Sequence, residues 1–465
     1  MGFLRKSGCY DSGFTRCSLM PSSRFSVAQE TLRAIVEDVL RRAARQGATQ
    51  CETDASESYG QTVTVRCGEV DTLEHNRDKS VGVTVYIGKQ RGYASTSDFA
   101  PKAIADTVDA ALSIARFTAS DDCNGLPDSS LMCKEVQELD LFHPWNLPVE
   151  EAITMAKAAE KAAFRLDKRI VNSDGASISC QHSRYEMGNS AGFLGGQQSS
   201  RHYLSCAVIA AEGDKMQRDD WYSSDRSSKF LAAPKAIGDY AGRRALARLR
   251  SRKIDTRQAP VLFEAPIANS LLGHFVAAIS GGSLYRKTSF LLDSIGEQIF
   301  SPIVNLSERP FIKRGNASGC YDDEGVQARD REVVSGGVVQ GYFLSSYSGR
   351  KLGMPTTGNA GGNYNLILQS GDRDFEGMLR EMGRGLLVTE LMGQGINLVT
   401  GDYSRGAAGF WVEGGEIQYP VEEITIAGNL RDMFKSIVAI GNDRLVRGSR
   451  DCGSILLENM TIAGS

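Results

Sequence analysis

A change of pattern near residue 257 constrains the fold of this chain more than any other feature. Before it, stretches with helical spacing mix irregularly with runs of β-branched residues. After it, short apolar runs are broken by glycine, as in GGVVQGYFLSSY (336–347), and helical spacing is confined to 267–279 and 375–387. Helices and strands that mix without strict β-α-β alternation predict an α+β fold rather than a doubly wound one.

This pattern divides the 465-residue chain into three predicted parts. Residues 1–22 are predicted to be a disordered extension, since they show no periodicity and no apolar segment of the kind that a signal peptide needs. Residues 23–256 are predicted to form a mixed α/β domain. Residues 257–465 are predicted to form a β-rich domain with few helices.

Within the first domain, four helices and several strands are expected from spacing and composition. The first helix is expected to begin with a capping box at Ser26–Gln29 and to end at Gly47. The other expected elements are helices over 101–117, 149–166 and 234–249 and strands over 61–66 and 81–87. The stretch 178–211 is expected to be strand-like, with turns at Gly188, Gly192, Gly195 and Gly196.

Charge and cysteine content exclude several classes of protein. The 53 basic and 56 acidic residues leave a formal charge of −3, so a nucleic-acid binder with a strongly basic surface is not expected. No apolar run approaches the roughly 18 residues of a membrane span. The ten cysteines form no C-x-x-C and no compact disulfide framework, which favours a reducing, cytoplasmic location.

Metal sites leave clear marks in a sequence, and this sequence has few of them. The five histidines are His75, His143, His182, His202 and His274. No two are one helical turn apart, the arrangement that commonly supplies two ligands of a catalytic zinc. We therefore predict no metal in this chain.

Single nucleophiles and bases are equally inconspicuous. His274 lies in an apolar helical stretch, where a hydrogen-bonded histidine inside a packed helix is favoured over a residue that lines a site. Cys452 and Cys320 each adjoin glycine, as reactive thiols do, but buried inert cysteine is the favoured interpretation of both.

Two polar clusters in the second half have a functional and a structural interpretation. Residues 321–325 (YDDEG) could bind a cation, but they lack the further oxygen ligands of a calcium loop, so a solvated turn is favoured. Residues 401–406 (GDYSRG) place Asp402, Tyr403 and Arg405 between glycines. A structural ion pair and a ligand-facing loop are equally compatible with this second cluster.

Longer motifs in the second half carry a family resemblance. They include SGGSLYRKTSFLLDSIGEQI (280–299), YDDEGV (321–326), SYSGRKLGMPTTGNAGG (346–362) and DCGSILLENMTIAG (451–464). Together with the segment 386–433, they strongly resemble the PmbA (TldE) branch of the TldD/PmbA family. The resemblance covers essentially all of 257–465 and, more weakly, the first domain.

The resemblance implies a two-domain protein that assembles as a dimer in a metalloprotease system. In this family the TldD branch resembles a zinc metallopeptidase, with an H-E-x-x-x-H helix and a later cysteine as third ligand. It implies a heterodimer of TldD with PmbA that degrades unfolded or leader peptides. The family label "modulator of DNA gyrase" would then describe an indirect effect of those substrates.

The same comparison indicates which subunit this chain resembles. The TldD metal helix falls on residues 273–278, where Gly273 and Ala278 would replace the histidines and His274 would stand in the place of the glutamate. Glycine and alanine cannot bind zinc. We therefore expect no catalytic residue and no metal in this chain, and zinc in a TldD-type partner.

The resemblance also gives candidate residues for the peptide chamber of such a complex. They are His274, Asp402, Tyr403, Arg405 and Cys452. An extended peptide would be held mainly by backbone hydrogen bonds to a strand edge. Neither nucleic acid nor membrane is an expected partner.

Two alternatives from other functional classes remain open at this point. One is a stand-alone, chaperone-like homodimer that binds unfolded segments without cutting them. The other is an autonomous hydrolase that uses Cys452 or Cys320 as its nucleophile.

Overall fold

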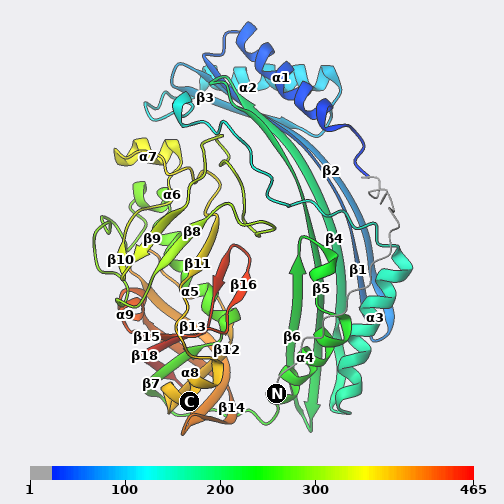
Figure 1. The fold of residues 1–465 in the computed structure, drawn as a ribbon, viewed down its shortest axis with the longest axis vertical. Helices are drawn as coiled ribbons and strands as arrows, with labels where there is room; N and C mark the ends of the chain where they lie inside the picture. Colours follow the sequence, from blue (N-terminus) through cyan, green and yellow to red (C-terminus); the bar gives the residue numbers. More distant parts are fainter. Residues whose placement is uncertain (1–23, 465) are drawn as a thin grey trace, which may run out of the picture.

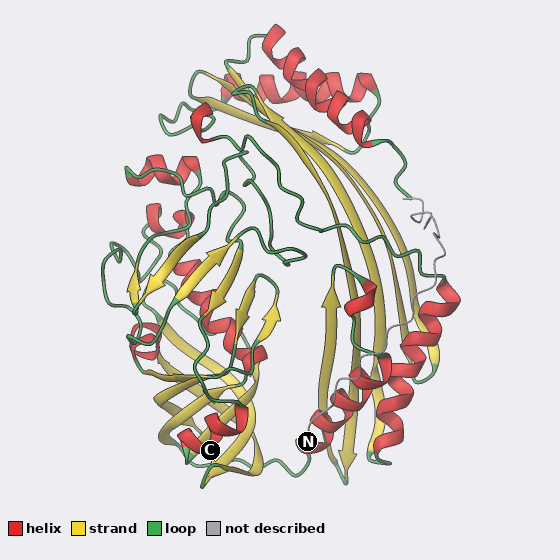
Figure 2. Ribbon diagram, in the orientation of Figure 1, coloured by secondary structure: helices red, strands yellow, loops and turns green. Residues whose placement is uncertain are grey.

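The computed structural model describes residues 24–464 (Figure 1). The predicted extension over 1–22 lies outside the described residues. The described chain contains nine α-helices and eighteen strands in three six-stranded sheets. A long curved sheet from the first half of the chain arches over the second half (Figures 1 and 2).

The arched sheet is antiparallel throughout, with the strand order β3-β2-β1-β4-β5-β6. In β1 and β4, buried and more exposed residues largely alternate along the whole strand, as expected where one face of a sheet is covered. Their bounds are β1 Gln50–Arg66, β2 Glu69–Ile87, β3 Gln90–Thr96, β4 Ile170–Asn189, β5 Leu194–Glu212 and β6 Lys215–Asp225.

Two helix pairs cover one face of this sheet. Cys51 and Ala55 of β1 pack under α1 (Gln29–Arg45) and α2 (Pro101–Phe117). Val63, on the same side of β1, packs under α3 (Val149–Leu166) and α4 (Pro234–Ala247). Since alternate residues of a strand share a face, all four helices lie on the outer face of the arch (Figure 1).

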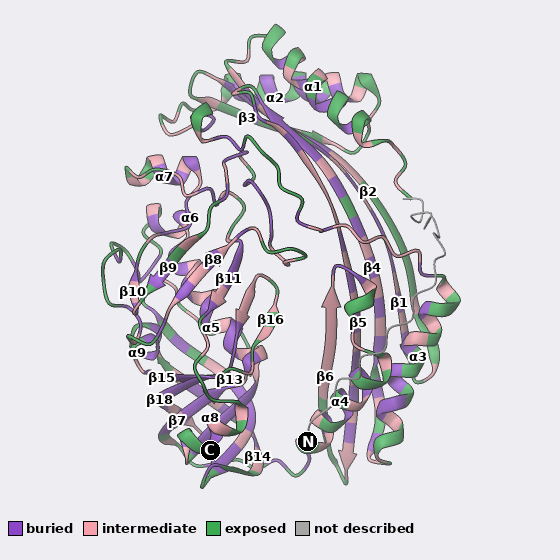
Figure 3. Ribbon diagram, viewed as in Figure 1, coloured by how far each residue is buried: buried purple, intermediate pink, exposed green. Residues whose placement is uncertain are grey.

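The inner face of the arched sheet is polar and faces the second half of the chain. Thr62 donates a hydrogen bond to Ser179 (3.1 Å), and the hydroxyls of Thr64 and Ser177 lie 2.7 Å apart. All four residues are half-buried. Residues of intermediate burial, drawn in pink, recur along the strands of the arched sheet in Figure 3. The sheet therefore presents hydroxyl groups, not an apolar surface, toward the rest of the molecule.

The second half contains two further sheets. One has the order β10-β9-β8-β11-β17-β16, and the other has the order β14-β13-β12-β7-β18-β15, with β14 also paired to β18. The first is formed by β8 Leu306–Arg309, β9 Arg331–Ser335, β10 Val338–Val339, β11 Asn365–Leu368, β16 Leu445–Arg447 and β17 Arg450–Cys452. The second is formed by β7 Arg257–Phe263, β12 Gly385–Met392, β13 Asp402–Glu413, β14 Glu416–Asn429, β15 Ile437–Ile440 and β18 Ile455–Ala463.

One large core lies between these sheets around a single apolar helix. Helix α5 buries Leu271, Leu272 and Phe275, and Phe275 meets Phe300 edge to face with ring centroids 4.8 Å apart. The helices of this half are α5 Ala265–Ala278, α6 Gly281–Tyr285, α7 Ser346–Leu352, α8 Phe375–Met382 and α9 Leu430–Lys435.

The α+β fold class is confirmed, with two differences in detail. The capping box at Ser26 is wrong: α1 begins at Gln29 after Ala28, and the Ser26 N–H instead donates to Glu57 (2.7 Å). The expected helix over 375–387 ends at Met382, because the chain turns at Gly383 (φ +63°) into β12. The division at 256/257 stays a prediction.

No helix in the described part of the chain is long and apolar enough to cross a membrane.

Candidate functional site

The middle of α5 is the first candidate site, because polar groups gather there against an otherwise apolar helix. Pro266 lies in the first turn, where its missing N–H removes no helical hydrogen bond. The buried side of the helix packs into the core. Gly273 and His274 lie on the other side and are half-exposed.

Strand β13 brings two of the predicted residues to His274. Tyr403 and Arg405 are two positions apart and so point to the same side of β13. The Tyr403 ring meets the His274 ring edge to face, with centroids 6.0 Å apart. Burial raises the pKa of Tyr403 to about 12, and the charge of Arg405 acts in the opposite direction.

A second arginine reaches α5 from β17. A Cβ added at Gly273 would lie 3.2 Å from Cζ and Nη1 of Arg450, so the guanidinium covers the bare backbone of the helix. Burial lowers the pKa of His274 to about 4, and the positive charges of Arg405 and Arg450 lower it further. His274 is therefore neutral at pH 7, beside two cations.

We call His274, Tyr403, Arg405 and Arg450 the α5 cluster. Their side chains have unusually few hydrogen-bond and salt-bridge partners. Within residues 24–464, neither arginine forms a salt bridge, and the neighbouring acid Asp451 is paired with Arg444. The buried atoms without a hydrogen-bond partner in that range include Nε2 of His274, the hydroxyl of Tyr403, Nε of Arg405 and Nε of Arg450. Most buried polar groups in folded proteins are satisfied, so this concentration indicates a place for a ligand.

The other two predicted residues do not join the cluster. Asp402 is exposed on the opposite side of β13, where it accepts hydrogen bonds from Thr400 (2.6 Å) and Asn429 (3.3 Å). Cys452 is fully buried, with its Sγ 3.9 Å from the carbonyl oxygen of Ala265 at the start of α5. That carbonyl is about 12 Å along the helix from Gly273.

The cysteines do not have the surroundings of nucleophiles. Burial raises the pKa of Cys452 to about 12, and the charges of Asp451 and Asp443 raise it further. Burial also raises the pKa of Cys320, whose Sγ accepts a hydrogen bond from the Gln137 N–H (3.2 Å). Both thiols stay protonated at neutral pH, which disfavours the cysteine-hydrolase alternative.

The α5 cluster does not fit a zinc ion. A structural or catalytic zinc takes three or four protein ligands from imidazole, thiolate and carboxylate groups. Here α5 presents one imidazole, and two guanidinium cations beside it repel a divalent ion. Across residues 24–464, no three His, Cys, Asp or Glu side chains are placed to hold a metal ion. That this chain contains no cofactor of its own stays a prediction.

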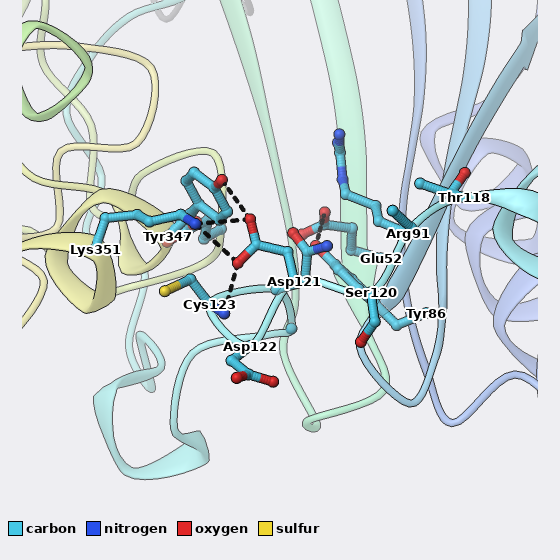
Figure 4. Close-up of a pocket in the computed structure, with 14 residues that line it drawn as sticks. Glu52, Tyr86, Arg91, Thr118, Ser120, Asp121, Asp122, Cys123, Tyr347 and Lys351 are labelled. Carbon is cyan, nitrogen blue, oxygen red and sulfur yellow. Dashed lines mark hydrogen bonds and ion pairs between the residues drawn. The ribbon is translucent and has the colours of Figure 1, made fainter. Parts of the chain in front are cut away.

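Another hollow lies elsewhere, between the arched sheet and α7 (Figure 4). We call this hollow the clasp pocket, and its volume is about 1050 Å³. Asp121 is its centre: it accepts hydrogen bonds from Tyr347 (2.8 Å) and Lys351 (2.9 Å). Its lining residues include Glu52, Tyr86, Arg91, Asp121, Asp122, Cys123, Glu324, Tyr347 and Lys351.

Carboxyl groups meet behind this pocket at the contact between the two halves. Burial and the negative charge of Glu324 raise the pKa of Glu52 to about 7, and the same two causes raise the pKa of Asp322 to about 7. Asp322 is 5% exposed and accepts the backbone N–H groups of Val326 and Ala360, both at 2.9 Å. The turn predicted over 321–325 is present, but the expectation that it is solvated is wrong at Asp322.

The two places differ in how their polar groups are satisfied. In the clasp pocket, Asp121, Tyr347 and Lys351 bind one another (Figure 4). In the α5 cluster, the polar groups approach one another without pairing. The clasp pocket is therefore a junction between the halves, and the α5 cluster is the better candidate for binding a ligand.

Sequence reasoning missed Arg450, although it is central to the cluster. The available signal was Gly273 itself, because a glycine in the middle of an apolar helix lowers helix stability and indicates a close neighbour. Nothing in the sequence showed that this neighbour would be Arg450, which lies on β17 and 177 positions after Gly273.

Comparisons with known proteins agree across nearly the whole described chain. Models described as PmbA/TldA metallopeptidase domain 1, central domain and C-terminal domain match residues 51–115, 142–249 and 256–464. Metalloprotease PmbA of Escherichia coli O157:H7 is 47% identical over 438 residues, which cover 94% of this chain and 97% of that protein.

More distant relatives carry other names. A Metalloprotease TldD homolog of Haemophilus influenzae is 23% identical over 398 residues, covering 81% of this chain and 82% of that protein. A crystal structure from Bacteroides thetaiotaomicron, described as a modulator of DNA gyrase, has a TM-score of 0.88 at 26% identity, covering 93% of this chain and 99% of that one. The chain belongs to the PmbA/TldD family of metalloprotease-related proteins.

Proposed function

We propose that this chain is the PmbA/TldE-like subunit of a TldD/TldE-type zinc metalloprotease complex that degrades unfolded or leader peptides. In this proposal a TldD-type partner supplies the zinc. This chain shapes the peptide chamber and binds the peptide.

The composition of the α5 cluster is the single observation that carries the proposal. The segment that resembles the metal helix of the TldD branch is α5, and Gly273 there lies under the guanidinium of Arg450. Two cations and a neutral imidazole suit neither zinc binding nor the activation of water by a carboxylate. Cutting a peptide by zinc chemistry then requires another subunit.

The arrangement of the two halves supports a role in holding peptide. The polar inner face of the arched sheet lies opposite the second half (Figure 1), and a hollow of about 300 Å³ lies between β6 and α5. Strand β6 is the last strand of its sheet, so within residues 24–464 one of its edges has no strand partner and offers a place for an extended peptide to pair. Backbone pairing would select for unfolded chain with little sequence preference.

Location and self-association form part of the same proposal. The eight cysteines of the described residues are all free thiols, as suits a reducing cytoplasm. We infer that the chain pairs with itself when no TldD-type partner is present.

The test measures metal and cleavage with and without a partner. The chain is purified alone and together with a TldD-type protein, and bound zinc and the cleavage of an unstructured fluorogenic peptide are measured for each. We expect zinc and cleavage only in the combined sample, with loss of cleavage when a chelator removes the metal.

Each other result has a definite meaning. Stoichiometric zinc with cleavage by the lone chain would overturn the proposal. Peptide binding by a homodimer that never associates with a TldD-type protein in native mass spectrometry would favour the chaperone-like alternative.

A further inference from the structure

The α5 cluster contains two positive charges that the protein itself does not balance. Arg405 and Arg450 are half-buried, and within residues 24–464 neither has a carboxylate partner. Their Nε atoms are buried without an acceptor. Taking a charge out of water without pairing it is costly, so an anion that enters the cluster would recover a large part of that cost.

The donor groups of the cluster suit a planar, two-oxygen anion. A guanidinium presents parallel N–H groups that match the two oxygens of a carboxylate. Arg450 reaches the cluster from β17 and Arg405 from β13, so the two forks approach from different elements. The unpartnered hydroxyl of Tyr403 and Nε2 of His274 supply further hydrogen-bonding atoms beside them.

We propose that the α5 cluster of His274, Tyr403, Arg405 and Arg450 binds the carboxylate of a bound peptide. The inference rests on the proposed function, because it gives the peptide-binding subunit a site for one end or one acidic side chain of its peptide. Gly273 gives the Arg450 guanidinium room: a Cβ there would lie 3.2 Å from it, so the arginine end would have to shift slightly.

The proposal also explains why the aspartate side chains near the cluster bind residues outside it. Asp451 pairs with Arg444, and Asp402 points to the other side of β13, where Thr400 and Asn429 bind it. An internal carboxylate in the cluster would compete with a peptide. Without such an internal carboxylate, the two arginines can bind the carboxylate of a peptide.

The test uses three fluorescein-labelled hexapeptides of alanine and serine and the full chain. One peptide has a free C-terminal carboxylate, one is C-terminally amidated, and one is amidated but contains a glutamate. Fluorescence anisotropy gives the dissociation constants. We expect at least one carboxylate-bearing peptide to bind tenfold or more tightly than the plain amide, since charge-assisted hydrogen bonds are strong (about tenfold or more each).

The variants Arg405→Gln and Arg450→Gln are expected to abolish that preference. Arg444→Gln is the matched control, because Arg444 is an exposed arginine beside the same hairpin and pairs only with Asp451. It should retain the preference. Thermal unfolding of each variant checks that the chain is folded.

The three peptides separate the possible sources of the carboxylate. Preference for the free acid alone identifies a peptide C-terminus, and preference for the glutamate peptide identifies an acidic side chain. Equal binding of all three peptides, binding of none, or a preference that survives both Arg variants would overturn the inference.

Failure of this inference is distinguishable from failure of the proposed function. If zinc-dependent cleavage by the combined subunits is found without any carboxylate preference, the inference fails and the proposed function stands. If the lone chain shows the preference but never supports cleavage with a TldD-type partner, the site is real and the proposed function fails.

Discussion

Arg450 has a charge without a salt-bridge partner among residues 24–464. Removing it tests how much this unpaired charge lowers the stability of the folded protein. In Arg450→Met an unbranched apolar side chain remains, while the guanidinium that lies over Gly273 and its buried Nε are lost. Because an unpaired, half-buried cation is unfavourable, we expect the melting temperature to rise by about 2 °C, equivalent to roughly 1 kcal/mol. Differential scanning calorimetry at low salt measures it.

Arg444→Met serves as the control for this change. It removes an exposed arginine that is paired with Asp451, so the melting temperature should stay level or fall slightly. A larger fall for Arg450→Met than for Arg444→Met would mean that Arg450 stabilises the fold.

Glu52 gives a pH-dependent prediction. Its pKa is raised to about 7, first by burial and then by Glu324, so its ionisation in the folded state is unfavourable. A carboxyl group with a raised folded pKa leaves stability intact below about pH 4.5, and stability is lost progressively as the pH rises from about 4.5 to about 7. Glu52→Gln, which can still accept the Tyr86 hydrogen bond, should therefore stabilise the protein by about 1–2 kcal/mol at pH 8.

The measurement is chemical unfolding of both proteins at pH 5 and pH 8. The stability gain of Glu52→Gln should be largest at pH 8 and only about a quarter as large at pH 5. Glu30→Gln, at an exposed carboxyl on α1, should show a change of no more than about 0.5 kcal/mol at either pH. A gain that is equal at both pH values would contradict the assignment to Glu52 ionisation.

At the scale of elements, the contact between α3 and α4 depends on a glycine. A Cβ at Gly238 would lie 1.8 Å from the carbonyl oxygen of Ala159, so alanine would force the two helices apart. Although alanine favours helix by about 1 kcal/mol, we expect Gly238→Ala to destabilise the protein by about 2–3 kcal/mol. Gly341→Ala should be close to neutral in the same urea unfolding experiment, because its Cβ would lie 3.4 Å from the nearest atom, Nη1 of Arg331, which is an ordinary van der Waals contact.

Elements with a strong local pattern could be predicted from the sequence, and others could not. Helices α2 and α3 begin and end where spacing placed them, at Pro101–Phe117 and Val149–Leu166. Strand β2 extends from Glu69, well before the predicted 81–87, because its first part is exposed and has no apolar alternation to mark it. Tertiary pairing with β1 determines that part.

The candidate site was predictable only in part, for a similar reason. Tyr403 and Arg405 lie on one side of a strand by alternation, so their partnership follows from the sequence. Alternation also puts Asp402 on the other side, but this required recognising 402–413 as a strand instead of a loop. The approach of Arg450 depends on how β17 packs against α5, which no local pattern encodes.

At the scale of the whole molecule, the relation between the halves rests on contacts between residues far apart in the sequence. Arg350 on α7 donates to the backbone carbonyls of Cys123 (3.0 Å), Gly125 (2.7 Å) and Leu126, more than 220 positions earlier. Local periodicity carries no information on such contacts. They fix the arched sheet over the second half at the clasp pocket, as Figure 4 shows for the neighbouring Asp121 and Lys351.

Removing this guanidinium should loosen the two halves without unfolding either. In Arg350→Ala three carbonyl groups lose a charged donor, and we expect stability to fall by about 2 kcal/mol. Hydrogen exchange should quicken in α7 and in residues 118–126 and stay unchanged in α3 and α4, which pack on the far end of the sheet. Lys351→Ala, which removes a partly exposed ion pair to Asp121, should cost less than about 1 kcal/mol. Faster exchange throughout the chain in Arg350→Ala would mean that the clasp supports global folding, and unchanged exchange in α7 would mean that other contacts hold the halves together.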